Sequence, residues 1–206
     1  MTDHELRSEA DLRTTYAEPS QGARDKALDH VDVHARAFIA LSPFFCIGSS
    51  RPDDLADVSP RGGEPGFVHV LDAKRLAFPD RPGNNRLDTL TNIVRAPAVG
   101  LLFFIPGFDE MLRINGLATV STAEDLMARF VVEGKRPRSV VVVAVRESYL
   151  HCTKALRRSD LWNPGKRVPR SALPSFGQMV KDQLKSIVPA KIIDFALDQD
   201  ARKNLY

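Results

Sequence analysis

The chain has 206 residues, of which 43% are hydrophobic and 27% are charged, and its formal net charge is +3. These values are those of one globular domain with room for a substantial core. No apolar run approaches the length of a membrane span, and the polar, acidic residues 1–5 are unlike a secretion signal. We therefore expect a cytoplasmic protein with no membrane partner.

Cysteine and histidine give no sign of a metal centre. Cys46 and Cys152 lie far apart in apolar, strand-like contexts, and they form neither a metal-ligand spacing nor a disulfide framework. The five histidines are scattered along the chain. We expect no metal site, and a reducing compartment is consistent with this cysteine usage.

The first part of the chain predicts a helix followed by short strands. Residues 1–20 are polar and predict an arm or a short helix. Apolar residues recur every three or four positions over residues 23–40, which predicts an amphipathic helix. Strands, turns and connections follow in the order strand 44–48, turn 51–54, strand 55–60, flexible connection 61–66, and a hairpin of strands 67–71 and 75–78.

The second part predicts longer strands and further helices. An apolar strand at 99–105 is expected to be central, and a strand at 111–120 returns beside it. Residues 121–124, Ser-Thr-Ala-Glu, have the pattern of a capping box that starts a short helix through Phe130. The remaining expected elements are a Val-rich strand at 139–145, a strand-like piece at 149–152, and helical stretches at 179–187 and 191–197.

The most informative segment runs from Phe78 to Arg86. A strand-like run ends at Phe78, Pro82-Gly83 breaks it, and a helix-like run begins at Asn85. A strand, a tight turn and a helix start bring free backbone N–H groups and the positive helix end to one spot. Arg81 and Arg86 lie on either side of this spot, and their planar guanidinium groups suit phosphate oxygens. The segment is consistent with a phosphate site and with a hairpin exit that carries an ordinary Asn cap.

Positive charge gathers near the C-terminus. Residues 154–191 contain nine Lys or Arg against two acids. Such a segment is able to contact nucleic acid or another anion. Because aromatic residues are not interleaved with the charges, we favour a small anionic ligand over nucleic acid.

The order of elements suits an antiparallel barrel with peripheral helices rather than a doubly wound sheet. Four segments then resemble the pyridoxamine 5′-phosphate oxidase-like FMN-binding split-barrel proteins, and among them a bacterial flavoprotein branch. These segments are residues 57–62, 79–86, 112–118 and 152–162. The resemblance implies a mainly β fold: a six-stranded antiparallel split β-barrel with N- and C-terminal helices. It also implies a homodimer with two FMN sites at the subunit interface.

Three segments follow from this resemblance: an N-terminal arm (1–20), the FMN-binding split-barrel domain with its leading helix (21–165), and a C-terminal helical extension packed on the barrel (166–206).

The resemblance also implies which residues bind the cofactor. Those expected at the FMN phosphate are Asn84, Asn85, Arg86 and, less directly, Arg61. Those expected along the flavin and the ribityl chain are Asp57, Val58, Ser59 and Pro60. Pro79, Asp80 and Arg81 would frame the pyrimidine side of the ring. Met111, Arg113, Lys154 and Trp162 would close over the ring from the partner subunit.

Several of these residues have structural alternatives. Arg113 is also consistent with an exposed or ion-paired strand residue, and Trp162 with a packed core or interface residue. Asp57 is also consistent with a turn acid, and Ser59 with a plain strand residue.

The expected function is that of an FMN-dependent oxidoreductase acting on a small molecule, with a nicotinamide electron donor as a further candidate partner. Alternatives are a flavin-binding or electron-storage protein without turnover and a nucleic-acid-binding domain. A deazaflavin or haem in place of FMN also stays open. Residues 198–206 contain nothing like the Arg-x-His segment that grips substrate in the parent enzymes, so we do not expect oxidation of vitamin B6 phosphates.

Overall fold

The computed structural model describes residues 4–53 and 55–206, so residues 1–3 of the predicted arm and Asp54 of the predicted turn lie outside the described residues. Seven strands form one antiparallel sheet in the order β2-β1-β5-β6-β7-β4-β3. They are β1 (Phe44–Ser50), β2 (Ala56–Gly62), β3 (His69–Asp72), β4 (Arg75–Asp80), β5 (Ala98–Phe104), β6 (Met111–Ser121) and β7 (Ser139–His151).

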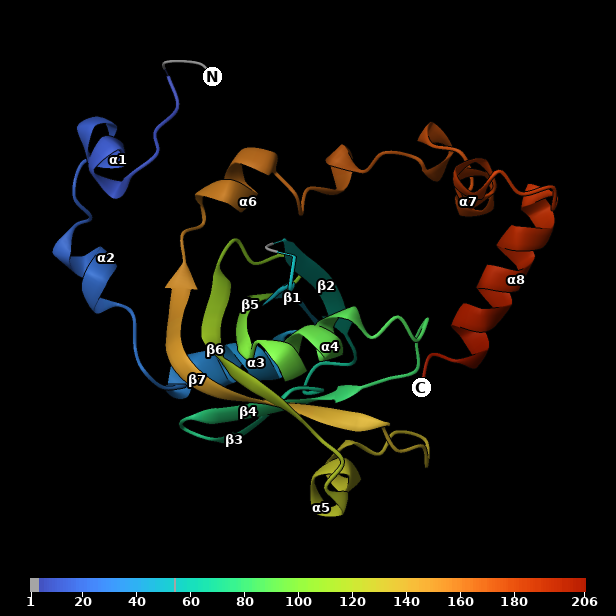
Figure 1. Cartoon of the computed structure of the whole chain (residues 1–206), viewed down its shortest axis with the longest axis horizontal. Coiled ribbons are helices and arrows are strands. Elements are labelled where there is room, and N and C mark those ends of the chain that lie inside the picture. Colours follow the sequence, from blue (N-terminus) through green and yellow to red (C-terminus); the bar gives the residue numbers. More distant parts are fainter. Residues whose placement is uncertain (1–3, 54) are drawn as a thin grey trace.

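The predicted fold class is confirmed, with one correction to the strand count. In Figure 1, β3 and β4 run across the lower part of the view, whereas β1, β2 and β5 stand upright above them. The sheet thus curls as a split barrel. It has seven strands rather than six, because the short strand β3 pairs with β4 at the edge of the sheet.

Aromatic side chains fill the interior where the sheet curls. Phe45 of β1 lies 4.8 Å from Phe103 of β5 and 5.0 Å from Phe78 of β4, measured between ring centroids. All three are buried, and alternate residues of β1 and β5 point to the same side. Contacts of this kind add to the burial of apolar area and hold the two halves of the sheet together.

The long strand β7 connects the two halves of the barrel. It pairs with β6 from Met111↔His151 to Ser121↔Val140, and with β4 from Arg75↔Ala144 to Asp80↔Ser139. The separate strand-like pieces predicted at 139–145 and 149–152 are therefore one continuous strand. A bulge at Arg146 of β7, opposite Asn115 and Gly116 of β6, shifts the register part-way along, which allows the pair to bend.

The predicted helix at 23–40 is wrong in its middle. The segment forms two helices, α2 (Gln21–Asp25) and α3 (Val33–Leu41), with extended chain between them. Leu28 exchanges backbone hydrogen bonds with Ser148 of β7, at N···O distances of 3.0 and 2.7 Å. Asp32 then starts α3, because its side chain accepts a hydrogen bond from the backbone N–H of Ala35.

The predicted capping box at 121–124 does not form. Ser121 remains in β6, where it pairs with Val140, and its hydroxyl accepts a hydrogen bond from the N–H of Ala123. Helix α5 (Glu124–Met127) begins after Ala123 without a side-chain cap and continues as a 3₁₀ turn through Phe130. The short helix is present as predicted, but its capping is different.

Helix α4 (Asp88–Arg95) starts three residues later than predicted. Asn85 and Leu87 have φ angles of 58° and 59°, which an α-helix of L-residues does not accept. The helix then docks on the barrel through Ile93 and Asn92, both of which are buried. Asn92 Nδ2 donates to Ser49 Oγ of β1 at 3.0 Å.

The remaining helices lie outside the barrel. The N-terminal segment contains α1 (Glu9–Thr15), and the C-terminal segment contains α6 (Lys154–Ser159), α7 (Phe176–Leu184) and α8 (Ala190–Lys203). Figure 1 shows α6, α7 and α8 as an arc around one side of the barrel, with α8 leading back toward α4. Helices α7 and α8 pack closely, since the N–H of Gly177 donates to Asp194 at 2.6 Å. None of the residues of α8 is buried.

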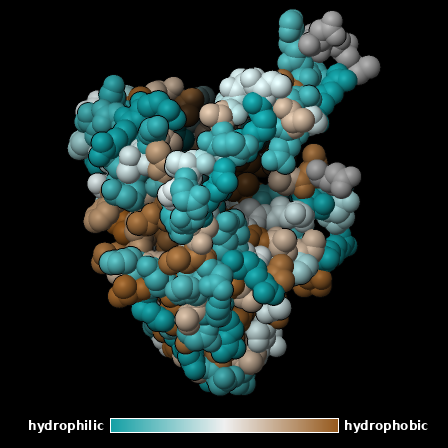
Figure 2. Space-filling model, turned by 90° about the vertical axis from the view of Figure 1, so that its left-hand side faces the viewer, coloured by the Kyte–Doolittle hydropathy of each residue, from teal (hydrophilic) through white to brown (hydrophobic). Residues whose placement is uncertain are grey.

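The surface is mixed in polarity. Figure 2, which looks from the side that carries α1 and α2 in Figure 1, shows apolar side chains exposed between polar ones. Within the described residues, no helix combines the length and the apolar character needed to cross a bilayer.

The Asn92–Ser49 contact yields a prediction about stability. Replacing Asn92 with Ala leaves the buried Ser49 hydroxyl without its partner, which we expect to lower the free energy of unfolding by about 1–3 kcal/mol. Urea unfolding measures this value. Thr91→Ala, at an exposed position of the same helix, is the control and should change stability by less than about 0.5 kcal/mol. Equal effects of the two substitutions would contradict the role given to Asn92.

Candidate functional site

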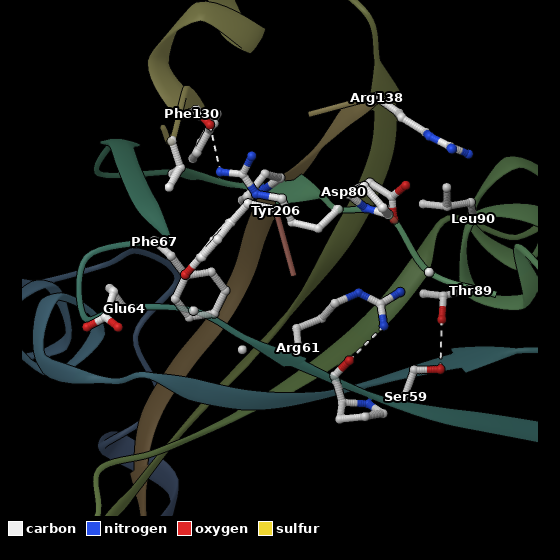
Figure 3. A pocket seen from close by; sticks show the side chains of 18 of the residues that line it. Ser59, Arg61, Glu64, Phe67, Asp80, Thr89, Leu90, Phe130, Arg138 and Tyr206 are labelled. Carbon is white, nitrogen blue, oxygen red and sulfur yellow. Dashed lines mark hydrogen bonds between the residues drawn. The ribbon is translucent and has the colours of Figure 1, made fainter. Parts of the chain in front are cut away.

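A pocket of about 820 Å³ opens between the barrel and the turn before α4. Its first wall is the end of β2 with the loop that follows, residues 59–67. Its second wall is the end of β4, the turn and the first residues of α4, residues 79–90. The third wall comes from residues 129–132, Arg138 and Tyr206. Figure 3 shows how these walls face one another.

The turn at 84–86 carries the groups that the sequence predicts for an anion. The Oδ1 atom of Asn84 accepts a hydrogen bond from the N–H of Arg86 at 3.1 Å, and Arg86 Nε contacts the Asp88 carboxylate at 2.9 Å. Asn85 Oδ1 accepts a hydrogen bond from Arg138 Nη1 at 2.7 Å. Leu87 occupies the cap position of α4, and it offers no side-chain cap bond. The ordinary Asn cap is therefore absent, and the first N–H groups of α4 stay available to a ligand.

Polar side chains of β2 face the start of α4. The hydroxyl of Thr89 donates to Ser59 Oγ at 3.0 Å and lies 3.4 Å from Asp57 Oδ2. Thr89 is buried, whereas Ser59 and Asp57 are partly buried. Val58, between them in sequence, points to the other face of the strand and is 68% exposed. Only the alternate residues of this predicted set therefore turn toward α4.

Asp80 lies in the field of two guanidinium groups. Burial raises the pKa of the Asp80 carboxyl, and the positive charges of Arg61 and Arg138 oppose that rise. Burial lowers the pKa of Arg61, and Asp80 and Asp57 oppose that change. Arg61 Nη1 also donates to the carbonyl of Pro60 at 2.8 Å. The partial burial of these charges strengthens their mutual interaction.

The opposite side of the pocket is aromatic. His69 and Phe130 stack with ring centroids 4.2 Å apart, and Phe67 and Tyr206 lie on the same side in Figure 3. Burial lowers the pKa of His69, and the nearby Arg129 lowers it further. Arg81 Nη2 donates to the Phe130 carbonyl at 2.7 Å. An aromatic ring system is the kind of ligand that such a wall accommodates.

Six of the predicted residues do not line this pocket: Asp57 and Val58 of β2, and four residues farther away in the chain. Met111 is buried in β6, and Lys154 is exposed at the start of α6. Arg113 Nη1 donates to the Tyr149 hydroxyl at 2.9 Å, and Trp162 Nε1 donates to the carbonyl of Phe108 at 2.8 Å. A contribution of these four residues from a partner subunit stays a prediction.

Some pocket residues were not predicted from the sequence. They are chiefly Thr89, Leu90, Arg129, Phe130, Arg138 and Tyr206. The position of Arg138 at the end of a strand could have been read from the sequence, because the residue directly precedes the predicted Val-rich strand, now β7. No local sequence pattern places Tyr206 at the pocket, because it reaches the pocket only through the path of α7 and α8. Among the described residues, no group of three His, Cys, Asp or Glu side chains could hold a metal ion.

The family model for pyridoxamine 5′-phosphate oxidase matches residues 31–152, which span all seven strands up to the end of β7. The chain belongs to this family. No curated protein matches it.

Solved structures of low identity resemble the chain. HupZ of Group A Streptococcus is 12% identical, with 58% of this chain and 93% of that chain covered and a TM-score of 0.48. Rv2991 of Mycobacterium tuberculosis is 14% identical, with 70% and 97% covered and a TM-score of 0.45. General Stress Protein 26 of Bacillus anthracis is 14% identical, with 57% and 94% covered and a TM-score of 0.37. The assignment to the family rests on the match of the family model.

The pKa of Asp80 yields a prediction about pH. Because its folded pKa is raised, Asp80 destabilises the folded state progressively as pH rises through that folded pKa. Asp80→Asn should therefore gain stability relative to the parent as pH rises from about 3 to 7.

Asp72→Asn is the matched control, because the pKa of Asp72 is shifted in the opposite direction from that of Asp80. The pKa of Asp72 is lowered, chiefly by its hydrogen bond with Arg75, so its stabilising effect is present above the unfolded pKa and lost as pH falls. Asp72→Asn should therefore lose stability relative to the parent as pH rises over the same range. Urea unfolding at several pH values gives both trends, and parallel trends in the two variants would contradict the assignment.

Proposed function

We propose that this protein is an FMN-binding flavoprotein and that it acts as an oxidoreductase on a small molecule. The observation that carries the proposal is the pocket itself, which has a turn suited to an anion on one side and an aromatic wall on the other. FMN has this same division, with a phosphate at one end and a ring system at the other. Family membership supports a flavin-type ligand.

The residues present fit FMN in three parts. The N–H groups at the start of α4 and the side chain of Arg86 suit the phosphate. Ser59 and Thr89 offer hydroxyls of the kind that bind a ribityl chain, and Asp57 lies beside them. Pro79, Asp80 and Arg81 form the wall between these groups and the aromatic side, where a ring with carbonyl and N–H groups finds hydrogen-bond partners.

Bound FMN would supply the redox chemistry, and the chain would bind, orient and shield it. No nucleophile or acid–base pair is needed for that function. FMN is favoured over FAD because the sequence has no Gly-x-Gly-x-x-Gly fingerprint for a pyrophosphate.

The proposal is tested by the cofactor that copurifies with the protein. We expect a flavin absorbance spectrum and a released compound with the mass of FMN. The mass of FAD, a deazaflavin or haem, or no flavin bound at saturating FMN, would refute this cofactor assignment. Bleaching by NADH or NADPH followed by reoxidation separates an oxidoreductase from a flavin store or carrier, which would stay oxidised.

Arg86→Ala should weaken FMN binding and leave the fold intact. Arg86 is exposed, and its partner in the chain is the surface carboxylate of Asp88, so the side chain is free to turn to a phosphate. Loss of one charge-assisted contact should cost about 1.5–3 kcal/mol, on the order of tenfold to a hundredfold in affinity. Quenching of FMN fluorescence measures this change. Arg75→Ala, at the other end of β4, is the control, and equal affinities of both variants would remove Arg86 from the site.

We also propose a homodimer with FMN at its interface. Leu117 of β6 is 39% exposed on the outer face of the sheet, and a two-fold dimer that covers such a face uses one patch twice. Met111, Arg113, Lys154 and Trp162 would then close the partner's site.

Light scattering at micromolar protein should give twice the chain mass of 22.9 kDa. FMN should stabilise the dimer, because it would contact both chains. A monomer with full flavin occupancy would contradict the roles given to those four residues.

A further inference from the structure

Arg81 differs from the neighbouring arginines of the pocket. Arg86 pairs with Asp88, and Arg138 donates to Asn85. Arg61 and Arg138 also share the field of Asp80. Arg81 forms no ion pair with a carboxylate in the part of the chain that the structure describes. Burial lowers the pKa of the Arg81 guanidinium, and the charge of Tyr206 opposes that change. Because no side-chain carboxylate pairs with this partly buried guanidinium, an anion from outside the chain is favoured there.

Two contacts hold the Arg81 side chain in place, but one nitrogen of its guanidinium has no hydrogen-bond partner. Nη2 donates to the Phe130 carbonyl at 2.7 Å, and the Tyr206 ring centroid lies 5.3 Å from the guanidinium carbon. Nη1 is buried and has no hydrogen-bond partner among residues 4–53 and 55–206. An unpaired buried donor is costly, so a ligand that accepts its hydrogen bond is favoured. The two existing contacts also reduce the ordering cost of binding.

The surroundings of Arg81 define the rest of the ligand. Phe67 and Phe130 lie on the same side of the pocket in Figure 3, and His69 stacks on Phe130. Figure 3 shows Ser59 and Thr89, which lie beside the start of α4, on the other side from Phe130. FMN has a single phosphate, and the turn at 84–86 suits it, so the unpaired donor of Arg81 is left for a different anion.

We propose that Arg81 forms a second anion subsite in this pocket, which binds the carboxylate of an aromatic or heteroaromatic acid beside the cofactor. The pocket volume of about 820 Å³ lies near the top of the range, about 300–1,000 Å³, that small-molecule sites occupy. The proposal deepens the proposed function, because it gives the chemical class of the small-molecule substrate. The alternative contact of Arg81, with the pyrimidine side of the flavin, is an outcome of the test.

Benzoate is the probe, and benzamide is its uncharged control. Calorimetry is carried out on the full chain, both stripped of flavin and loaded with FMN. We expect benzoate to bind in both states and benzamide to bind at least about tenfold more weakly. Arg81→Gln should lose at least about tenfold in benzoate affinity when measured on the flavin-free protein, where a contact of Arg81 with the flavin plays no part.

Two further variants complete the design. Arg86→Ala should show the reverse pattern, with weaker FMN binding and unchanged benzoate binding to the flavin-free protein. Arg75→Gln, an exposed arginine outside the pocket, should leave both affinities unchanged. If Arg81→Gln does not fold, as judged by circular dichroism, Arg81→Lys takes its place. Lysine keeps the charge without the planar fork, and a loss of severalfold in benzoate affinity is then expected.

The outcomes separate this proposal from the proposed function. It is overturned if millimolar benzoate does not bind to the parent, or if the Arg81 variant and the Arg75 control bind benzoate equally. It is also overturned if Arg81→Gln loses FMN affinity as strongly as Arg86→Ala and keeps its benzoate affinity, since Arg81 is then a cofactor contact. If FMN does not bind but benzoate binding depends on Arg81, the FMN assignment fails and the subsite stands.

Discussion

The pairing of β4 with β7 is the constraint on which the pocket depends. Strand β7 pairs with β6 along one edge and with β4 along the other, so the end of β4 is fixed to the middle of the sheet. A slip of one residue would turn Phe78 to the opposite face of the sheet, moving an aromatic ring out of the core. The chain leaves the sheet after Asp80 and must reach α4, which is docked on β1. Residues 81–87, between the end of β4 and the start of α4, therefore form one wall of the pocket.

Electrostatics in this pocket follow from the same arrangement. Five arginines line it (Arg61, Arg81, Arg86, Arg129 and Arg138), against three acids (Glu64, Asp80 and Asp88). Asp80 offsets the charge of Arg61 and Arg138 at the end of β4, and Asp88 offsets that of Arg86 at the start of α4. The remaining positive charge lies beside aromatic rings, where solvent screens it less than at an open surface. An anionic ligand relieves this imbalance.

The sequence predicted the features that depend on local pattern. The apolar strands β1 and β5, the β3–β4 hairpin and the turn at 84–86 are all visible in short stretches, and the turn does lie at the pocket. Features set by distant contacts were missed. The helix at 23–40 is interrupted because Leu28 pairs with Ser148, 120 residues away, and Ser121 stays in β6 because Val140 is its strand partner. Phe130 and Tyr206 reach the pocket only through the folded chain, so no local pattern marks them.

The two proposed anion-binding positions share one short segment of chain. Arg81 and Arg86 are five residues apart, between a strand end fixed by β7 and a helix fixed by Ser49. Asn85 and Leu87 within this segment have positive φ angles, which cost conformational energy that the surrounding contacts must offset. A ligand bound at either position restrains the same backbone and so lowers the ordering cost for a ligand at the other. We therefore expect occupancy of the two proposed positions to be coupled through this segment.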